Sequence, residues 1–317
     1  MNGPFDVSAV CTPHCAAHTA RPVPLPGTAR RAAAFTGAVG RALAAGPHLA
    51  DPVRLGAHAR ALLAALAVGL EVRGAGATGR LSVPGPEERA PGTARVPGTL
   101  IVLNHVSWLD IVALLAVEPA VLLAKREVGH WPLVGGLARR AGTHFIDRTS
   151  PRQLPRTVRE LSALLLAGRS VAVFPQATTW CTADQGGFRR ATFQAALDAG
   201  APVRPVTVDY AQQGRPTTVA AFCGADTFAA SLRRVIAARG LTVRFTVHPA
   251  LPTAGRGLDR RALTAAAERV VLGGGRAALD AGQVPDRTGQ VPDRTGQVPD
   301  RTGQVPDRTG QALGTYL

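Results

Sequence analysis

Aromatic residues and lysine are scarce in this chain of 317 residues. Aromatics make up 4% of the sequence, and Lys125 is the single lysine among 36 basic residues. The formal net charge of +15 suits a polyanionic partner, such as nucleic acid, anionic lipid or a phosphorylated substrate. Nucleic-acid binding typically requires a basic patch with interleaved aromatics, and no zinc-finger or leucine-zipper pattern occurs. The composition therefore disfavours nucleic acid as the partner.

Cysteine is also rare. The chain has four, at Cys11, Cys15, Cys181 and Cys223. This number implies no disulfide framework in a chain this long, so we expect a reducing compartment. The first two lie next to His14 and His18, and the four side chains can be drawn as a metal cluster. Their spacing fits no common zinc motif and the segment has little core to support one, so we expect no metal.

No apolar run is long enough to cross a bilayer, which takes about 20 residues. The longest run near the front, residues 61–70, has ten. The first residues include Asp6 and show neither a basic nor an apolar segment, so we expect no signal peptide. A soluble or surface-bound protein follows.

Residues 51–70 have a helical pattern, and two interpretations fit it. In the first interpretation, the helix lies on a membrane surface with its arginines at the headgroups. In the second, it packs on the sheet as an ordinary helix. Residues 1–50 are rich in proline, alanine and arginine. We expect them to form an N-terminal extension that is poorly ordered or contains a short basic helix.

Strand and helix patterns alternate from residue 51 to residue 275. Strands are predicted at residues 70–74, 100–103, 120–124, 144–148, 170–175, 202–208 and 241–248. Helices are predicted at residues 108–117, 131–141, 152–167, 188–199, 226–239 and 259–272. This alternation predicts an α/β domain with helices covering the sheet. Two prolines in residues 202–208 indicate strand ends or a sheet edge.

The final segment, residues 276–317, contains the sequence Gly-Gln-Val-Pro-Asp-Arg-Thr four times without variation, from Gly282 to Thr309. Each copy has one apolar residue and one proline, which excludes a coiled coil. Each copy also has one Asp and one Arg and is neutral. We expect a disordered tail.

The stretch from Thr99 to Asp110 organises the rest of the chain. Residues 100–103 are a continuous apolar run, typical of a strand covered on both faces. Ser107 is a good N-cap for a helix that begins at Trp108. A polar cluster therefore follows a core strand, where open α/β sheets bind their ligands. Its members are Asn104, His105, Ser107 and Asp110.

His105 and Asp110 are five residues apart, and on one regular helix they would point about 140° apart. A strand end followed by a tight turn brings them together, so that the carboxylate fixes the imidazole tautomer and leaves the other nitrogen to take a proton. A second interpretation is structural. Ser107 and Asp110 resemble a capping box with Asp in place of Glu or Gln, and His105 is then a satisfied buried histidine. The residues alone leave both interpretations open.

Four segments in order resemble the motifs of the glycerolipid acyltransferase family, of the bacterial lysophosphatidic acid acyltransferase type. They are the His-x4-Asp block at 104–110, Gly-Thr-His-Phe-Ile-Asp-Arg at 142–148, Val-Phe-Pro-Gln-Ala-Thr-Thr at 173–179, and a proline-containing strand at 203–206. The resemblance covers residues 68–250 and implies an acyltransferase domain over 51–275, with a mixed, largely parallel central sheet flanked by helices. It implies transfer of a fatty acyl group from acyl-CoA or acyl carrier protein to a lysolipid hydroxyl. The expected location is the cytoplasmic face of the cell membrane, bound peripherally.

The resemblance also implies roles for individual residues. His105 removes the proton of the acceptor hydroxyl, and Asp110 holds the imidazole ring and stabilises the imidazolium that forms. The acyl donor is a substrate, so no resident cofactor is implied. The residues expected to contact substrate are Asn104, Ser107, Lys125, Arg148, Gln176, Thr178, Thr179 and Arg189.

Among these, Arg148 is expected to hold an acceptor phosphate through two parallel hydrogen bonds, with Lys125 as a second phosphate ligand. The structural alternatives are an ion pair between Arg148 and Asp147, and solvated charges at Lys125 and Arg189. For the two threonine hydroxyls the alternative is stabilisation of a turn.

The third block departs from the family pattern, which has Glu-Gly where this chain has Gln176-Ala177. Glutamine keeps the size and hydrogen bonding of glutamate but loses its charge. Alanine does not easily adopt a positive φ, if the glycine serves that purpose. Three outcomes fit: an altered acceptor such as a phosphate-free lysolipid, weakened activity, or a non-catalytic lipid-surface relative.

A serine hydrolase is the rival enzyme class, with Ser107 or Ser170 as nucleophile. The sequence Gly168-Arg-Ser170-Val-Ala172 is only distantly related to the Gly-x-Ser-x-Gly elbow. Ser170 also lies where a strand begins, whereas the elbow follows a strand.

Overall fold

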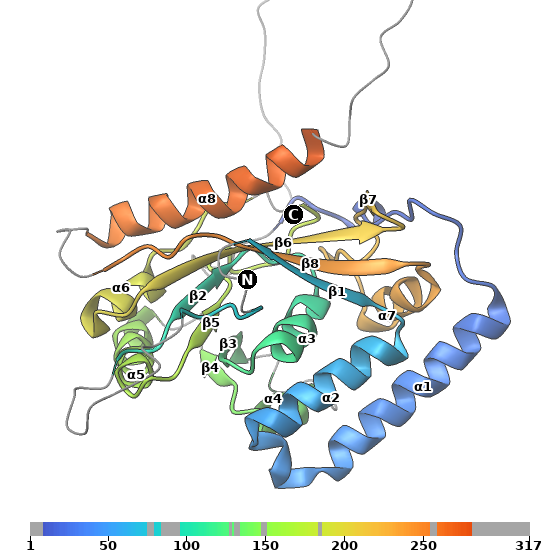
Figure 1. Cartoon of the computed structure of the whole chain (residues 1–317), viewed down its shortest axis with the longest axis horizontal. Coiled ribbons are helices and arrows are strands. Elements are labelled where there is room, and N and C mark those ends of the chain that lie inside the picture. Colours follow the sequence, from blue (N-terminus) through green and yellow to red (C-terminus); the bar gives the residue numbers. More distant parts are fainter. Residues whose placement is uncertain are drawn as a thin grey trace, which may run out of the picture. The chain divides into compact units, whose positions relative to one another are not determined.

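A mixed sheet of eight strands forms the centre of the structure (Figure 1), in the order β1-β8-β6-β2-β5-β3-β4 with β7 paired to β6. The strands are β1 Gly69–Gly74, β2 Leu100–Leu103, β3 Val121–Lys125, β4 His144–Ile146, β5 Val171–Val173, β6 Val203–Gln212, β7 Arg215–Pro216 and β8 Leu241–Val247. Among the described strands, β6 pairs antiparallel with β7 and β8, and the other pairs are parallel. The predicted mixed, largely parallel sheet is confirmed.

The computed structural model describes residues 9–74, 79–83, 96–126, 129, 134–146, 151–182, 186–253 and 259–280. They belong to one compact unit that spans Met1–Gln283. The tail was predicted to begin at residue 276, but residues 276–280 still belong to a helix that ends at Asp280. The rest of the predicted tail, with its repeats, lies outside the described residues, as do Asp147 and Arg148.

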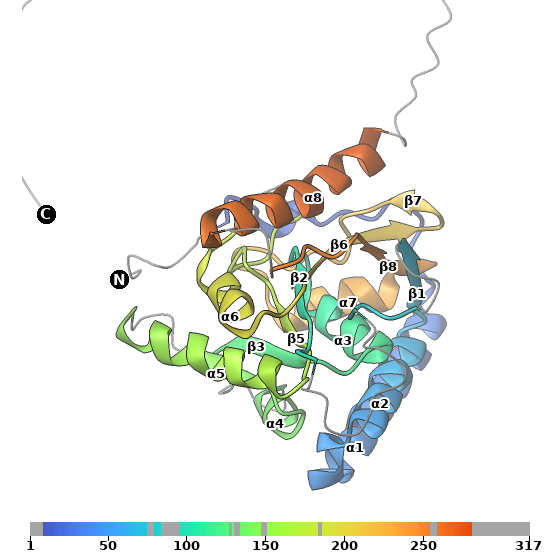
Figure 2. The same cartoon turned by 60° about the vertical axis from the view of Figure 1, so that its left-hand side comes forward.

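Helices cover both faces of the sheet, as Figures 1 and 2 show. They are α1 Leu25–Ala44, α2 Pro52–Ala65, α3 Trp108–Val117, α4 Val134–Arg140, α5 Leu154–Leu166, α6 Ala191–Ala199, α7 Phe228–Ala237 and α8 Arg260–Asp280. One apolar cluster lies under α2, α3 and α7, with α1 packed against it. A second cluster lies under α5, α6 and α8. Short 3-10 turns occur at Pro13–Cys15, Gly46–Ala50 and Pro151–Gln153.

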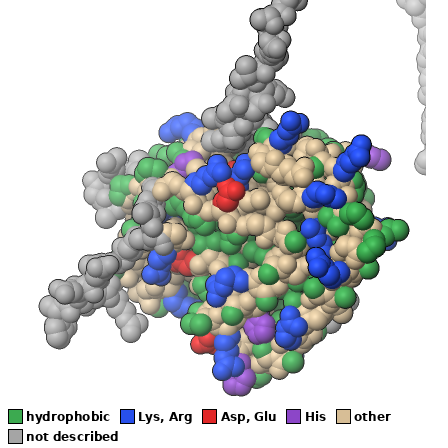
Figure 3. Space-filling model, turned by 45° about the vertical axis from the view of Figure 1, so that its right-hand side comes forward, with side chains coloured by type: hydrophobic (Ala, Val, Ile, Leu, Met, Phe, Trp, Pro, Cys, Tyr) green, Lys and Arg blue, Asp and Glu red, His purple; other side chains and the backbone are tan. Residues whose placement is uncertain are grey.

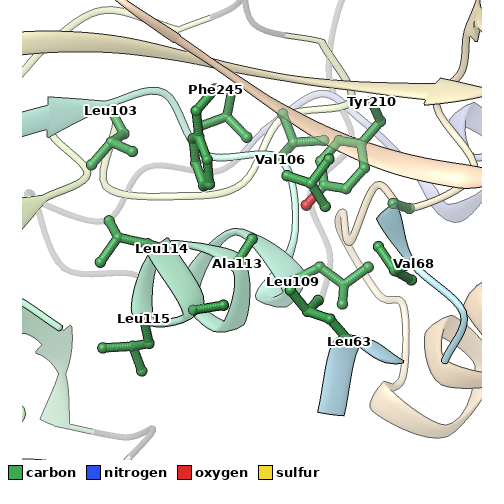
Figure 4. Close-up of a cluster of buried hydrophobic side chains, with 14 of the residues drawn as sticks. Leu63, Val68, Leu103, Val106, Leu109, Ala113, Leu114, Leu115, Tyr210 and Phe245 are labelled. Carbon is green, nitrogen blue, oxygen red and sulfur yellow. The ribbon is translucent and has the colours of Figure 1, made fainter. Parts of the chain in front are cut away.

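Strand β2 divides its side chains between the two clusters because successive residues of a strand point to opposite faces. Leu100 and Val102 pack with α5, α6 and α8, and Ile101 and Leu103 pack on the opposite face. All four are fully buried, and each stabilises the fold by about 1.5–3 kcal/mol. Figure 4 shows Leu103 opposite the apolar side of α3. Burial on both faces thus explains the unbroken apolar run.

Strand β6 corrects one expectation. The prolines indicated a strand end or an edge, but β6 lies inside the sheet between β8 and β2. Pro202 does precede the strand, whereas Pro205 pairs with Val102 in the parallel register. The carbonyl of Pro205 accepts from the N–H of His248, one residue beyond the end of β8. In a strand, the nitrogen and the carbonyl of one residue point to the same side, so the nitrogen of Pro205 also faces the β8 side. Because β8 has already ended there, the missing N–H of Pro205 removes no hydrogen bond between the two strands.

Helix α2 packs on α1 and α3, so the structure decides between the two interpretations of residues 51–70. Leu55, Ala59 and Leu63 are buried in the core. Arg60 donates to the carbonyl of Ala116 near the end of α3, at 3.0 Å. The apolar face of α2 is therefore covered by protein and not available to a membrane.

The N-terminal segment is more ordered than expected. In place of a short helix the structure has α1, with 20 residues. Arg31 on α1 donates to the carbonyls of Ile236 and Ala238 at the end of α7, at 3.0 and 2.7 Å. Residues 9–50 thus belong to the same compact unit as the sheet.

Candidate functional site

The site is built on the turn that joins β2 to α3. His105 follows β2, and α3 begins three residues later with Ser107 as its N-cap. The side chain of Ser107 accepts from the N–H of Leu109 at 3.3 Å. Because β2 is parallel to β5 and β6, this turn lies at the carboxyl edge of three adjacent strands, where ligands bind in α/β sheets.

Asp110 is the buried centre of the turn, with a side chain that is 0% exposed. Its Oδ2 lies 2.8 Å from Nδ1 of His105 and accepts from the N–H groups of Val106 and Ser107, at 2.7 and 3.0 Å. The capping box is present, and so is the contact with His105. The contacts expected by the two sequence interpretations therefore occur together, because one carboxylate caps the helix and holds the imidazole, while the catalytic role of His105 stays a prediction.

Tyr210 on β6 completes the arrangement, and sequence reasoning missed it. Its hydroxyl donates to Oδ1 of Asp110, and Figure 4 shows the ring among the side chains around the first turn of α3. Burial, and next the charge of Asp110, raise the pKa of Tyr210 well above its usual value, so the hydroxyl remains a donor. The sequence did contain a signal for it. Tyr210 shares the face of its strand with Val206 and Val208, and a tyrosine hydroxyl buried on such a face needs a hydrogen-bond partner.

The imidazole of His105 is the part of this network that reaches the surface. Its side chain is 18% exposed and stacks on Phe174, with ring centroids 4.3 Å apart and planes inclined by 28°. With Nδ1 held by the carboxylate, Nε2 is the ring nitrogen left available to accept a proton. The backbone carbonyl of His105 accepts from the N–H of Trp180 at 2.8 Å, so the segment after β5 fixes the turn.

Gln176 supports His105 from within the protein. Its side chain is buried, with 1% exposed, and its Oε1 accepts from the backbone N–H of His105 at 2.7 Å. We predicted that this side chain contacts substrate. Because it is buried, it instead supports the backbone at His105. Glutamine and glutamate both offer such an acceptor oxygen.

Asn104 and Ser107 are also placed differently from the prediction that they contact substrate. Both are fully buried. The amide of Asn104 donates to the carbonyl of Val208 at 2.9 Å and accepts from its N–H at 2.7 Å. Asn104 therefore extends the pairing of β2 with β6 by a side chain, and Ser107 is bound in the helix cap.

The other predicted substrate contacts differ in position. The hydroxyl of Thr179 donates to the carbonyl of Phe222, which is the structural alternative for this residue. Thr178 is half-buried in the same loop, and Arg189 is exposed beyond it. Lys125 ends β3, with a side chain outside the described part, and Arg148 lies outside it entirely. Roles for Thr178, Arg189, Lys125 and Arg148 stay predictions.

Ala177 has φ +65°. This left-handed conformation costs an alanine about 1–2 kcal/mol and suits the glycine of the family pattern. The residue is buried directly beside Gln176. Residue 177 therefore has a backbone conformation that a glycine adopts without strain and an alanine does not.

Ser170 lies at the opposite end of the sheet from His105. It precedes β5, and its hydroxyl accepts from the N–H of Thr99, just before β2. A hollow at this amino edge is lined by Arg80, Ser82, Thr99, Glu118 and Ser170. Neither Ser170 nor the buried Ser107 has the exposed post-strand position of a nucleophile elbow.

Basic side chains stand out on the surface. Figure 3 shows the molecule turned so that the side with α1 and α7 comes forward, and on this face basic side chains outnumber acidic ones. In the described ranges, every helix is too short or too polar to span a bilayer.

Comparisons with known proteins agree with the motifs. A family model described as Acyltransferase matches residues 83–209. A 1-acyl-sn-glycerol-3-phosphate acyltransferase of Neisseria meningitidis is 38% identical over 186 residues, which are 58% of this chain and 66% of that protein. A lyso-ornithine lipid O-acyltransferase of Pseudomonas aeruginosa is 37% identical over 186 residues, which are 58% of this chain and 70% of that protein. The chain thus spans slightly less than two thirds of the Neisseria relative.

The fold has a counterpart of known structure. The crystal structure of the 1-acyl-sn-glycerophosphate acyltransferase of Thermotoga maritima matches with a TM-score of 0.54 at 19% identity, over 80% of this chain and 95% of that one. This likeness supports the sheet and helix arrangement. Since the Pseudomonas relative is matched over 70% of its length at 37% identity, the chain belongs to the acyltransferase family that includes the lysophosphatidate and lyso-ornithine lipid acyltransferases.

Proposed function

We propose that the protein transfers a fatty acyl group from acyl-CoA or acyl carrier protein to the hydroxyl of a lysolipid. The observation that carries this proposal is the 2.8 Å contact between His105 and the buried carboxylate of Asp110, with the imidazole partly exposed at the carboxyl edge of the sheet. The names of the relatives supply the substrate class.

In this reaction Nε2 of His105 takes the proton of the acceptor hydroxyl as its oxygen attacks the acyl thioester carbonyl. Asp110 stabilises the imidazolium that forms. The new ester C–O bond forms, the C–S bond breaks, and the proton passes from the imidazolium to the departing thiolate. No covalent enzyme intermediate is needed, and atoms and charge balance.

Two acceptor classes are compatible with the site. A 1-acylglycerol-3-phosphate fits a basic protein, with Arg148, Lys125 and Arg189 as proposed phosphate ligands and Thr178 as a donor. A phosphate-free acceptor such as lyso-ornithine lipid is the second candidate, favoured by the relative in Pseudomonas aeruginosa. In both cases the proposed location is peripheral, on the cytoplasmic face of the cell membrane, where the lysolipid resides.

The test is a panel of lysolipid acceptors offered with acyl-CoA and with acyl carrier protein, with products identified by mass spectrometry. We expect a diacyl product from lysophosphatidate or from lyso-ornithine lipid, together with an equal amount of free thiol. Hydrolysis to free fatty acid without an acylated lipid would reject acyl transfer. Absence of every product would favour the non-catalytic, lipid-surface relative.

A second proposal concerns the third motif. Gln176→Glu restores the family's charge without changing the shape or the acceptor oxygen that His105 binds. We expect the ratio of phosphate-bearing to phosphate-free turnover to change in this variant. Identical rates with every acceptor would show that Gln176 does not limit the acceptor.

A further inference from the structure

All four cysteines of the chain lie in one cluster, although they come from three segments far apart in the sequence. Cys11 and Cys15 lie in the arm that precedes α1, Cys181 follows the third motif, and Cys223 precedes α7. The sulfur atoms of Cys11, Cys15 and Cys181 all lie within 4.8 Å of one another. Cys223 and Cys11 are buried in the same core cluster, against which Cys15 and Cys181 pack. The four cysteines of the chain therefore meet at one place in the fold, although the residue is rare in the sequence.

The distances suit a single metal ion. The Sγ atoms of Cys11 and Cys181 are 3.4 Å apart, well beyond the roughly 2.05 Å of a disulfide bond. Two thiolates bound at about 2.3 Å to one tetrahedral zinc ion lie about 3.8 Å apart. Small side-chain adjustments therefore bring the thiols to coordination distance.

We propose that Cys11, Cys15 and Cys181 bind one Zn²⁺ ion, with Cys223 as the fourth ligand. Thiolate ligands select soft or borderline metals, and a four-thiolate tetrahedral set is a common structural zinc site. The sequence expectation of no metal considered only Cys11, Cys15 and their neighbouring histidines. The fold supplies two further thiols, which that expectation could not include.

The burial of the thiols suits a closed structural site, since Cys11 and Cys223 are buried and Cys15 and Cys181 are half-buried. Each thiol that binds the ion releases its proton to solvent, and the ion replaces the mutual repulsion of the thiolates by attraction.

The protein holds the cluster in place by contacts of its own. The hydroxyl of Thr218 donates to the carbonyl of Cys15 at 2.6 Å, and the side chain of Gln212 accepts from the N–H of Thr19 at 2.8 Å. A side chain at Gly224 would come within 2.7 Å of the carbonyl of Cys11. The arm, which runs past β7 to α1 in Figure 1, is therefore closely fitted against the ligand segments.

The cluster adjoins the catalytic turn. Trp180, next to Cys181, donates to the carbonyl of His105, and Phe222, next to Cys223, donates to the carbonyl of Val106 at 3.0 Å. The ion would tie the arm to the two segments that hold this turn. Its role would be structural, since the bonds that join its ligand segments to the turn run to backbone carbonyls.

The first test measures metal in the full chain, purified under reducing conditions without chelator. We expect about one zinc per chain by mass spectrometry of the elements, as for structural sites of this type. Cys15→Ser and Cys181→Ser should each lose most of it. His14→Ala is the matched control, because it removes an exposed candidate ligand from the same segment, and it should keep its zinc.

A titration of the wild-type chain keeps the proposal testable where a variant fails to fold. The chain is stripped with a chelator and titrated with Co²⁺ under reducing conditions. We expect the thiolate-to-cobalt and visible bands of tetrahedral cobalt, saturating at one equivalent and displaced by zinc. Cys223→Ser should shift these bands as one thiolate is lost.

Three results would overturn the proposal. One is a stripped chain that gives no thiolate-to-cobalt band. Another is zinc that is lost from His14→Ala but kept by Cys15→Ser and Cys181→Ser. The third is a metal-free chain in which Cys11 and Cys181 are joined by a disulfide, detected by alkylation and mass spectrometry. An unchanged spectrum in Cys223→Ser would remove the fourth ligand from the assignment.

Discussion

The carboxylate of Asp110 has four hydrogen-bonding partners, and this number explains how one residue serves structure and chemistry together. Three partners lie in the turn and the fourth is the hydroxyl of Tyr210. These donors hold both carboxylate oxygens in place. The fixed carboxylate orients His105 and, in the proposed reaction, balances the imidazolium that forms.

Tyr210→Phe tests whether Tyr210 positions this carboxylate. The change keeps the ring and removes the donor to Asp110, so the free energy of unfolding should fall by about 1.5–3 kcal/mol, the value of a hydrogen bond to a charged group. We expect a lower kcat with little change in KM, measured by steady-state kinetics and denaturant unfolding. Tyr316→Phe changes the chain's other tyrosine, in the predicted tail, and should change neither quantity. A full kcat in Tyr210→Phe would limit Tyr210 to packing.

Ala177→Gly should make the protein more stable. At φ +65° an alanine is strained and a glycine is not, and the gain is about 1 kcal/mol. Ala33→Gly, at an exposed position within α1, is the matched control and should lose about 1 kcal/mol. Both are measured by urea unfolding. Equal losses in the two variants would contradict the strain at Ala177.

Sequence reasoning found the residues of the site better than it found their contacts. His105 and Asp110 were identified because the motif places them across a turn. Asn104 and Gln176 were assigned to substrate, yet they bind backbone groups of Val208 and His105. A polar side chain next to a motif has a substrate or a distant strand as its partner, and spacing along the chain does not distinguish the two.

At the scale of elements, local patterns predicted most helices and strands. The helix predicted at residues 108–117 is α3 without any shift, since an N-cap and an unbroken apolar segment define it. The interior position of β6 was not predictable, because it depends on where β8 ends. The covered face of α2 likewise depends on α3, and an amphipathic pattern does not identify its partner.

Removing the cap of α3 tests the element and the rival hydrolase together. Ser107→Ala should lower the free energy of unfolding by about 1 kcal/mol, as for other N-cap losses, while acyl transfer persists. Thr227→Ala removes the cap of α7, whose side chain accepts from the N–H of Ala230 at 3.2 Å, and should lose a similar amount of stability. Complete loss of thiol release in a folded Ser107→Ala protein would favour a serine nucleophile.

At the scale of the whole molecule, the charge of +15 predicts binding to anionic lipid surfaces. Cationic side chains near such a surface each contribute about 1 kcal/mol. We expect the full chain to sediment with anionic vesicles, less with neutral ones, and to dissociate in about 1 M salt, where the Debye length falls to about 3 Å. A chain that stays in the supernatant with anionic vesicles at low salt would contradict peripheral binding.

The most direct measurement compares thiol release from the acyl donor by wild-type protein and His105→Ala at a saturating concentration of the acceptor that the panel identifies. Our account predicts that the variant, folded by circular dichroism, releases no thiol above the rate without enzyme, whereas His48→Ala, an exposed histidine between α1 and α2, keeps the wild-type rate. Full turnover by His105→Ala would contradict the account, since the lysolipid hydroxyl would then lose its proton without the imidazole of His105.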